Sequence, residues 1–295
     1  MMKKLLLISI LFAQLSATVF ANTLKLDFGV YGSERRNWVD DQNEPILRHL
    51  EKSLKAQLNK NVEINIVFFP AYKDALDALV DKKIDFARLG GASYVAVKRR
   101  SPNVSILASE SSKGRPYYEG VIGVLKDSPI KKVEDLKGRS FAFGNKSSTI
   151  GRYLSQKFLV DNGITAGDLA GYNYLGRHDN VAIAVIRDVY DAGAFKIDIL
   201  KNKNFSKRIR TIASFRAPTQ SWVARDGLDP LYTSSLKKGL LNTPKEAFII
   251  KNRDGFIEGD DSNFESLRNS IEHNSLFFMH KRTENTEQTS SYSDC

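Results

Sequence analysis

Residues 140–149 read Ser140-Phe141-Ala142-Phe143-Gly144-Asn145-Lys146-Ser147-Ser148-Thr149. The short apolar run at 140–143 predicts a buried strand, and the polar loop that follows leads into a helix predicted over 150–162. Gly163 directly after this span is typical of a helix C-terminus. A strand that turns straight into a helix is the repeating unit of α/β folds, so this stretch sets the expected fold class.

The same alternation continues in both directions along the chain. We predict strands at 25–31, 62–69, 84–89, 119–125, 140–143, 172–175, 192–195, 210–215 and 222–224. We predict helices at 45–58, 72–80, 131–136, 150–162, 180–187, 232–241 and 264–278. Strands that alternate with helices indicate an α/β fold whose sheets are mostly parallel and flanked by helices.

The order of these elements predicts two lobes. The first lobe takes residues 22–116, the second takes 117–213, and the chain then returns to the first lobe over 214–280. Two crossings, near 112–118 and 211–221, predict a clamshell with a two-stranded hinge. Ligands of open α/β sheets bind at the carboxyl ends of strands, so the cleft between the lobes is the expected ligand site. The polar stretch 281–295 is expected to be disordered.

The N-terminus resembles a secretory leader, assigned to residues 1–21. Lys3 and Lys4 form a basic start, 5–17 are apolar, and Val19-Phe20-Ala21 suits a cleavage site after Ala21. A retained membrane anchor is the alternative, but the apolar run is short for a span. No Cys lies near the site, which excludes a lipoprotein, so we expect a free protein in a bacterial periplasm.

Composition limits the classes of function. The 295 residues include 44 Lys plus Arg, 34 Asp plus Glu and one Cys, which is Cys295. One Cys cannot form an intramolecular disulfide, and 42% hydrophobic residues exclude a disordered chain. Loss of Lys3 and Lys4 changes the net charge from +10 to +8. This surplus is dispersed, apart from Lys98-Arg99-Arg100, and lacks the interleaved aromatic residues of a nucleic-acid platform, so we expect no nucleic-acid partner.

The loop at 144–149 predicts an anion site. Free backbone N–H groups at a helix start and three hydroxyls converge there, which suits the several oxygens of a tetrahedral oxyanion. The alternative is simple helix capping, for which one hydroxyl suffices. The Walker A spacing is absent, so this is not a nucleotide phosphate loop.

Further candidate residues follow other predicted strands. His178 precedes a helix start and is either a donor to the anion or a loop histidine. The Gly90-Gly91 turn is followed by two hydroxyl side chains, Ser93 and Tyr94, which could donate to a ligand. The alternative is an ordinary connection, because glycine-rich turns between strands and helices are common. Other side chains that could reach the same cleft are Tyr31, Tyr72, Arg36 and Arg88.

Catalytic and metal-binding motifs are absent from the sequence. There is no Gly-x-Ser-x-Gly elbow, no His-Glu-x-x-His and no Cys nucleophile in the mature core. The four His residues show no metal-ligand spacing. We therefore expect no catalytic residues, no metal and no cofactor.

Three segments together resemble the PhnD-like phosphate, phosphite and phosphonate solute-binding proteins of ABC transporters, within the type 2 periplasmic binding proteins. The resemblance covers most of residues 24–280. It is carried by Ile84-Asp85-Phe86-Ala87-Arg88-Leu89-Gly90-Gly91-Ala92-Ser93-Tyr94, by residues 135–143 running into 147–149, and by His178 followed by Asp191-Ala192-Gly193-Ala194.

The resemblance implies a ligand site shared by both lobes. Its implied members are Ser147, Ser148, Thr149 and His178 on one lobe, Tyr72 and Tyr94 on the other, and more weakly Tyr117 and Asp198. Ser93 of the glycine turn is a further candidate, and so is Arg88, which is less usual in the family. Relatives that take aminoalkyl phosphonates hold the amine with carboxylates. Asp198 stands at one such position, but Gln220 stands where a second acid is expected, which argues against an amine-bearing ligand.

The resemblance also implies the function. We expect a non-catalytic periplasmic receptor that closes around a small phosphorus-type oxyanion and delivers it to an ABC permease, acting as a monomer. Only a ligand that prefers the closed form can shift the opening equilibrium. A ligand sensor for a membrane histidine kinase is one alternative. A secreted phosphoester hydrolase is another, although the sequence lacks its nucleophile and metal set.

Overall fold

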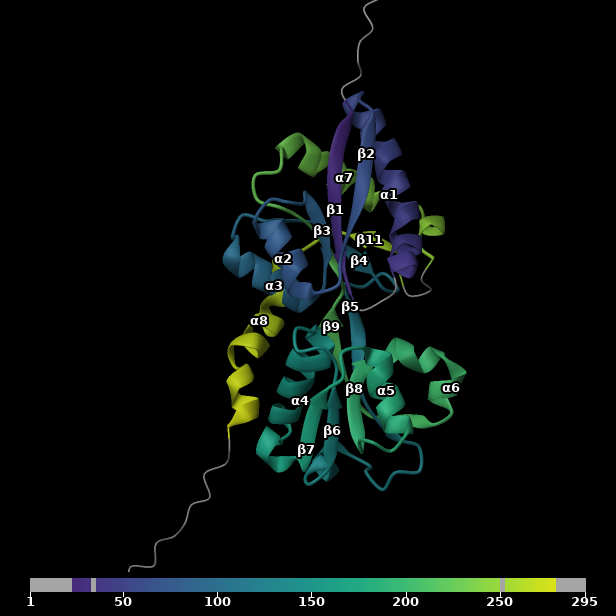
Figure 1. Ribbon diagram of the computed structural model, residues 1–295, viewed down its shortest axis with the longest axis vertical. Helices are drawn as coiled ribbons and strands as arrows, with labels where there is room; N and C mark the ends of the chain where they lie inside the picture. Colours follow the sequence, from purple (N-terminus) through teal and green to yellow (C-terminus); the bar gives the residue numbers. More distant parts are fainter. Residues whose placement is uncertain (1–22, 33–35, 250–252, 280–295) are drawn as a thin grey trace, which may run out of the picture.

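The computed structural model describes residues 23–32, 36–249 and 253–279. The expected leader at 1–21 and the expected tail at 281–295 lie outside the described residues. Figure 1 shows two lobes along the long axis of the molecule, each with a sheet flanked by helices.

The first lobe is built on a six-stranded sheet with the order β11-β4-β10-β3-β1-β2. Its strands are β1 (Leu24–Tyr31), β2 (Val62–Phe69), β3 (Phe86–Leu89), β4 (Ser105–Ser111), β10 (Ser221–Ala224) and β11 (Gly255–Ile257). β1 pairs in parallel with β2 and β3, whereas β10 is antiparallel to β3 and β4, and β11 is antiparallel to β4. In the core, the stacked rings of Phe28 and Trp222 lie 4.4 Å apart.

The second lobe is built on a five-stranded sheet with the order β7-β6-β8-β5-β9. Its strands are β5 (Tyr117–Leu125), β6 (Ser140–Phe143), β7 (Gly171–Tyr174), β8 (Ala192–Lys196) and β9 (Ile209–Pro218). β6 is parallel to β7 and β8, and β5 is antiparallel to β8 and β9. The two-lobed α/β class is therefore confirmed. Both sheets are mixed and not mostly parallel as predicted, because β10 and β11 in the first sheet and β5 in the second run against their neighbours.

The helices flank both sheets (Figure 1). They are α1 (Arg36–Leu58), α2 (Tyr72–Val80), α3 (Gly91–Arg100), α4 (Ser155–Asp161), α5 (His178–Ile186), α6 (Lys203–Ser206), α7 (Pro230–Leu241) and α8 (Glu265–Glu272). A π-helical turn, Thr149–Leu154, precedes α4, and short 3-10 turns occur at Val133–Leu136, Ala166–Asp168, Ile197–Lys201, Lys245–Ala247, Asp261–Phe264 and Asn274–Phe278.

α1 begins nine residues before the helix predicted from the sequence. The predicted start at Pro45 came from the helical spacing of apolar residues, which begins at Ile46. The structure instead places Pro45 inside the helix, which begins at Arg36. The extra turns carry Gln42 and Asn43, both of which are buried.

Two strands of the first lobe were not predicted. β4 carries mostly small and polar residues, and β11 has only three residues, so neither gives a clear apolar pattern. β4 nevertheless lies between β10 and β11 and is buried from Leu107 to Ser111. It contributes Glu110 to the interior of the lobe.

The lobes are joined by two adjacent crossings, in which β4 leads to β5 and β9 leads to β10. Tyr117 pairs with Pro218 at the crossing, and the Thr219 N–H donates to the Pro116 carbonyl at 2.9 Å. β9 remains in the second sheet as far as Pro218, so the lobe boundary expected at residue 214 falls within this strand.

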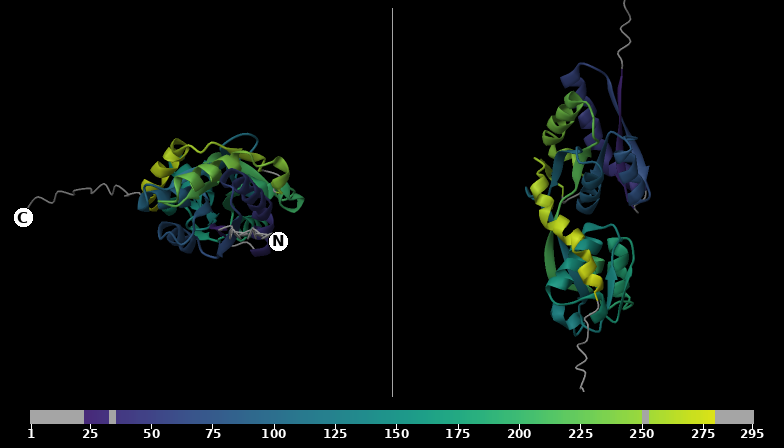
Figure 2. Two further views of the ribbon diagram at one scale, coloured as in Figure 1. Left: turned by 90° about the horizontal axis from the view of Figure 1, so that it is seen from above. Right: turned by 90° about the vertical axis from the view of Figure 1, so that its left-hand side faces the viewer.

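The C-terminal segment passes from the first lobe to the second. Leu267 of α8 belongs to the core that contains Tyr94, whereas the Phe277 ring lies 5.5 Å from that of Phe143 in the second lobe. Figure 2 shows this yellow segment running along the side of both lobes. The sequence assigned all of 214–280 to the first lobe, because helical spacing reveals a buried face but not the sheet that covers it.

We expect Phe277→Ala to lower the free energy of unfolding by about 3 kcal/mol, since truncation of a buried aromatic ring removes its packing and leaves a cavity. Phe277 is only 1% exposed and contacts the rings of Phe143 and Tyr172. Urea unfolding measures the change. Leu276→Ala is the matched control, because Leu276 is exposed one residue away. Equal losses for the two variants would show that the segment is not anchored through Phe277.

Candidate functional site

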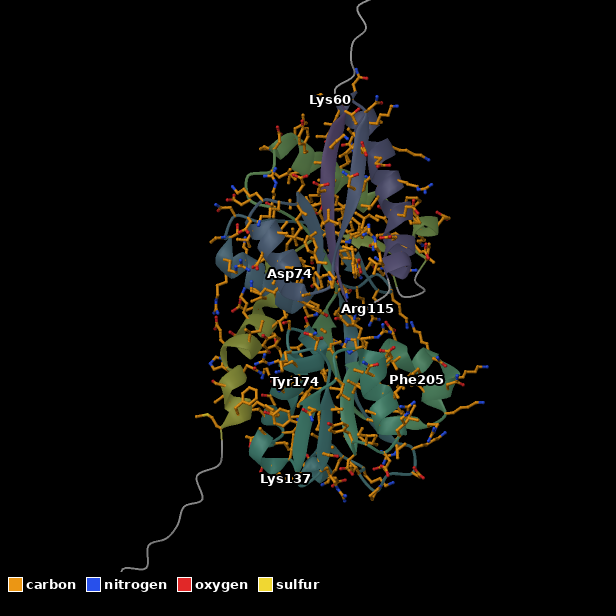
Figure 3. All side chains as sticks on the ribbon, in the orientation of Figure 1. Lys60, Asp74, Arg115, Lys137, Tyr174 and Phe205 are labelled. Carbon is orange, nitrogen blue, oxygen red and sulfur yellow. The ribbon has the colours of Figure 1, made fainter. Side chains whose placement is uncertain are left out.

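A cleft of about 430 Å³ lies between the two lobes. Its first wall comes from the ends of β1, β3 and β4 and from α1, and its second wall comes from residues 147–149, 176–179 and 196–199. Thr219 and Gln220 of the second crossing complete it. Figure 3 shows Arg115 at the level where the lobes meet, whereas Lys60 and Lys137 lie near opposite ends of the molecule.

The loop after β6 is held in one shape by its own hydrogen bonds. The Ser147 N–H donates to Asn145 Oδ1 at 2.8 Å, and the Ser148 N–H donates to the Asn145 carbonyl at 2.9 Å. Ser148 Oγ accepts from the Gly151 N–H at 2.9 Å, so Ser148 caps the helical turn that follows. The capping role expected for one hydroxyl is therefore filled by Ser148, and the other two hydroxyls are left for other partners.

The helical turn after this loop presents backbone donors at the cleft. Within the described ranges, no protein group accepts from the N–H groups of Thr149 and Ile150. Ser147, the residue two positions earlier, is exposed and lines the same cleft. The positive end of a helical segment and these converging donors favour an oxyanion.

Thr149 also connects the two lobes. Its Oγ1 accepts from the Ala92 N–H of α3 at 2.9 Å, and both groups are buried. A hydroxyl that accepts one hydrogen bond still has its own proton to donate. Thr149 can therefore hold the lobes together and donate to a ligand at the same time.

His178, the first residue of α5, lies at the second wall of the cleft. Within the described part of the chain, its buried Nδ1 has no hydrogen-bond partner. Burial, together with the Lys196 ammonium, lowers the pKa of His178 to about 3, although Asp179 acts in the opposite direction. The imidazole is therefore neutral at pH 7 and can donate one N–H.

We expect the free energy of unfolding to fall by about 1–2 kcal/mol more in the wild type than in His178→Asn when the pH drops from 7 to 5. The pKa of the unfolded imidazole is 6.5, so it takes up a proton in this range while the folded His178 does not. The unfolded state then binds more protons, and stability rises with pH between the two pKa values. Urea unfolding at both pH values tests this, and identical losses would contradict a buried neutral His178.

The first wall is organised by Tyr31 at the end of β1. Its hydroxyl accepts from the Gly90 N–H at 2.8 Å and donates to Ser93 Oγ at 2.7 Å. Its ring lies 4.4 Å from that of Tyr72. Burial raises the pKa of Tyr31, so this hydroxyl stays protonated and the turn before α3 is fixed against it.

A buried ionic cluster lies behind the first wall. Glu110 accepts two hydrogen bonds from Arg88, at 2.5 and 2.8 Å, and one from Arg253 at 2.9 Å. Trp222 Nε1 donates to the same carboxylate at 3.2 Å. Burial alone would raise the pKa of Glu110, but Arg253 and Arg88 outweigh it and lower the pKa to about 2.

Comparison of the chain with known proteins identifies its family. The sequence profile of a family described as "ABC transporter, phosphonate, periplasmic substrate-binding protein" matches residues 28–264. The chain belongs to this family. Proteins of the phosphonate-binding family are the periplasmic substrate-binding components of ABC transporters, and they work with a membrane permease.

Individual relatives agree with this assignment. A protein named "Probable ABC transporter phosphite binding protein PhnD1", from Prochlorococcus marinus (strain MIT 9301), is 26% identical over 287 residues, which cover 88% of this chain and 93% of that protein. Among solved structures, XAC2383 from Xanthomonas citri bound to chloride ion has a TM-score of 0.72 at 22% identity, covering 85% of this chain and 98% of that one. PhnD1 of Prochlorococcus marinus in complex with methylphosphonate has a TM-score of 0.68 at 21% identity, covering 84% and 97%. These likenesses show the shared fold.

Most of the residues predicted for the site line the cleft of this phosphonate-binding family member. Those that line it are Ser147, Ser148, Thr149, His178, Tyr72, Ser93, Asp198 and Arg88. Asp198 is paired with Lys201 at 3.2 Å, and Arg88 is held by Glu110. The part that each plays in binding stays a prediction.

Tyr94 lies away from the cleft, which corrects the sequence prediction. It is buried, its ring lies 4.5 Å from that of Phe264, and its hydroxyl donates to Asp261 at 2.5 Å. α3 begins at Gly91, so a residue one turn into the helix faces the terminal segment instead of the strand ends. Tyr94 therefore anchors the C-terminal segment to the first lobe.

Tyr117 was also predicted to line the cleft, and the structure corrects this. Its ring lies beneath the Arg216 guanidinium, with 4.6 Å between the guanidinium carbon and the ring centroid, and it does not line the cleft. Side chains alternate along a strand, so its neighbour Tyr118 faces the cleft instead. The Lys196 ammonium lies 4.9 Å from the Tyr118 ring centroid.

Several residues of the cleft were not predicted from the sequence. They are Gln42, Asn43, Glu110, Tyr118, Arg177, Lys196 and Arg253. Lys196 ends β8, and a search of every strand end for charged residues would have found it. Arg253 and Glu110 could not be found in this way, because no strand was predicted from the sequence at either position.

Two further observations concern the described residues. Within 23–32, 36–249 and 253–279, no helix combines the length and the apolar character needed to cross a membrane. In the same ranges, no group of three or more His, Cys, Asp or Glu side chains is arranged to hold a metal ion.

Proposed function

We propose that this chain captures a small phosphorus-type oxyanion in the cleft between its lobes, as a monomer released by cleavage after Ala21, without turning it over chemically. The observation that supports the proposal is that Ser147, Thr149 and His178 line one cleft, where, among the described residues, the Thr149 and Ile150 N–H groups and His178 Nδ1 have no protein partner. Several neutral donors at a helix start are what the oxygens of a phosphonate, phosphite or phosphate require.

The charges of the cleft support an anionic ligand. Lys196 and Arg177 come from the second lobe, and Arg88 and Arg253 from the first. The cleft also holds three carboxylates, Glu110, Asp179 and Asp198, so four positive charges against three negative ones leave a surplus of one positive charge. An amine-bearing ligand would meet repulsion here, in agreement with the neutral Gln220 at the second crossing.

Bound anion would also change His178. Negative charge beside an imidazole stabilises its protonated form, so the ligand raises the low pKa of His178. A hydrogen bond from imidazolium to the oxyanion is stronger than one from the neutral ring. Binding is then accompanied by proton uptake at mildly acidic pH.

Delivery to an ABC permease follows from the family and requires two states of the cleft. The ligand contacts residues from both lobes, so it binds more tightly when they approach. A sensor partner of a histidine kinase and a phosphoester hydrolase were the alternatives from the sequence, and neither is supported by the family or its named relatives.

Calorimetric titration of the mature protein with phosphate, phosphite, methylphosphonate, sulfate and arsenate tests the proposal. We expect at least one phosphorus oxyanion to bind, and Ser147→Ala to weaken it about tenfold through loss of one hydrogen bond to a charged group. Ser206→Ala is the control, because Ser206 is an exposed residue of α6 that does not line the cleft. If no phosphorus compound binds the wild type, the proposal is wrong.

A further inference from the structure

The first wall holds a second polar group of side chains, which the oxyanion site does not use. Gln42, Asn43 and Arg253 all line the cleft, although they are only 8%, 3% and 8% exposed. Within the described ranges, Gln42 Oε1, Asn43 Oδ1 and Arg253 Nε have no hydrogen-bond partner. An unpaired buried polar atom is energetically unfavourable, so three on the first wall of one cleft indicate a place for a ligand.

The side chains of Arg253 and Asn43 are held in place by hydrogen bonds, and the first of these uses the backbone of Gln42. Arg253 Nη2 donates to the Gln42 carbonyl at 3.2 Å, and Nη1 donates to Glu110 at 2.9 Å. Asn43 Nδ2 donates to the Val39 carbonyl at 2.7 Å. Because that amide nitrogen faces a carbonyl, Asn43 Oδ1 is fixed as an acceptor.

The unpaired atoms specify the chemistry of their partner. Two are acceptors, on Gln42 and Asn43, and one is a donor, on Arg253. A hydroxyl group both donates and accepts, so it can satisfy atoms of both kinds. A carboxylate only accepts and would leave the acceptors of Gln42 and Asn43 unpaired.

The local charge disfavours an ammonium group. Arg88 and Arg253 carry two positive charges against the single carboxylate of Glu110, which leaves a surplus of one. The second lobe adds Arg177 and Lys196 against Asp179 and Asp198, so the surplus over the whole cleft stays at one positive charge. A neutral group avoids this repulsion.

The size of the cleft leaves room for an organic substituent. Its volume of about 430 Å³ lies within the range of roughly 300–1,000 Å³ that is typical of organic ligand sites. The terminal amide torsion of glutamine is broad, so Gln42 can turn its oxygen to the cleft without leaving a favoured rotamer.

From these observations, and resting on the proposed function, we infer that the cleft takes a phosphorus oxyanion with a neutral hydroxylated substituent. The oxyanion occupies the helix start at 147–150 on the second lobe. The hydroxyl end contacts Gln42, Asn43 and Arg253 on the first lobe. A ligand of this kind spans both lobes, so its substituent adds to the preference for the closed state.

Calorimetry with four phosphonates of similar size tests the inference, namely ethylphosphonate, 2-hydroxyethylphosphonate, 2-aminoethylphosphonate and phosphonoacetate. We expect the hydroxyl compound to bind about tenfold more tightly than ethylphosphonate, and the amine to bind more weakly than both. Equal affinities of the hydroxyl and ethyl compounds would overturn the inference and leave the proposed function standing. Tightest binding of the amine or of phosphonoacetate would likewise overturn it. If none of the four binds while phosphate or phosphite does, the inference is overturned alone; if phosphate, phosphite and methylphosphonate also fail to bind, the proposed function itself fails.

A substitution of Gln42 tests where the hydroxyl group of the ligand is recognised. Gln42→Met preserves the length of the side chain and removes its amide, so we expect the affinity ratio of the hydroxyl compound to ethylphosphonate to fall about threefold or more. Gln57→Met, the same change at an exposed position of α1, is expected to keep the wild-type ratio. A ratio that is unaffected by Gln42→Met would show that the hydroxyl is recognised elsewhere and would overturn this assignment.

Discussion

Replacing Glu110 with Gln is expected to lower the free energy of unfolding by about 4–5 kcal/mol. Glu110 is buried and is the only carboxylate that contacts Arg88 and Arg253 among the described residues. Removing one partner of a buried ion pair costs about 3–5 kcal/mol, because the other charge is left without compensation. Here two guanidinium groups lose their carboxylate, which places the effect at the upper end.

The pH dependence of stability gives a second signature of Glu110. Its folded pKa is lowered from 4.5 to about 2, so the unfolded state takes up this proton first as the pH falls. The stability contributed by the ionised carboxylate is complete above about pH 4.5 and is lost as the pH falls towards 2. The wild type should therefore lose more stability than Glu110→Gln in this range.

Urea unfolding of both proteins at pH 7 and pH 3 measures both effects. Glu63→Gln is the matched control, because Glu63 belongs to the same sheet but forms an exposed pair with Lys25 at 3.4 Å. Surface pairs contribute only about 0–1 kcal/mol. A loss for Glu110→Gln that is no larger than that of Glu63→Gln would show that the cluster does not stabilise the first lobe.

The local pattern of the chain was enough to predict the elements that form the second-lobe wall of the cleft. The segment at 140–149 combines an apolar strand, a loop and a helix start, and the structure has β6, a capped loop and a helical turn there. His178 follows the same logic, because a predicted strand ends just before it. Such features depend on residues that are adjacent in the sequence, so they can be recognised from one sequence.

The direction of individual side chains could not be predicted in the same way. Tyr94 and Tyr117 have the right chemistry and lie near strand ends, but the phase of α3 and the alternation along β5 point them elsewhere. A shift of one residue in a helix start or a strand edge changes the face that a side chain occupies. Sequence patterns locate such boundaries only within a few residues.

The first-lobe wall of the cleft depends on contacts between residues that are far apart in the sequence. Glu110 meets Arg253 across 143 positions, and Arg253 meets Gln42 across 211. Neither partner has a distinctive neighbourhood, since β4 lacks an apolar pattern and Gln42 precedes a proline inside α1. Only the order of strands in the sheet, with late strands inserted beside β4, brings these groups together.

Gly151→Ala is expected to weaken binding of a phosphorus oxyanion about a hundredfold or more. A Cβ at Gly151 would lie 2.8 Å from Gly144 Cα, 3.0 Å from Ser148 Oγ and 3.1 Å from the Asn145 N atom. Two of these are backbone atoms, which cannot move aside by a change of rotamer. The methyl group must therefore separate the end of β6 from the helical turn.

That separation acts directly on the anion donors. The Gly144 N–H donates to the Gly151 carbonyl at 2.8 Å, and the Gly151 N–H donates to Ser148 Oγ, so both bonds hold the loop against the turn. If they break, the amides of Thr149 and Ile150 no longer converge with the Ser147 hydroxyl. Hydrogen bonds to charged groups contribute about 1.5–3 kcal/mol each, and loss of two corresponds to a hundredfold or greater change in affinity.

Gly171→Ala provides the matched control for this experiment, because Gly171 lies in β7 of the same sheet and a Cβ there meets nothing within 4 Å. Titration of both variants with methylphosphonate, after circular dichroism has shown that each is folded, separates a local change in the loop from general unfolding. Wild-type affinity in folded Gly151→Ala would mean that the oxyanion does not bind at this helix start. Since ordinary overpacking costs only about 1–3 kcal/mol of stability, a folded variant that no longer binds is the result that the close contact of Gly144 and Gly151 predicts.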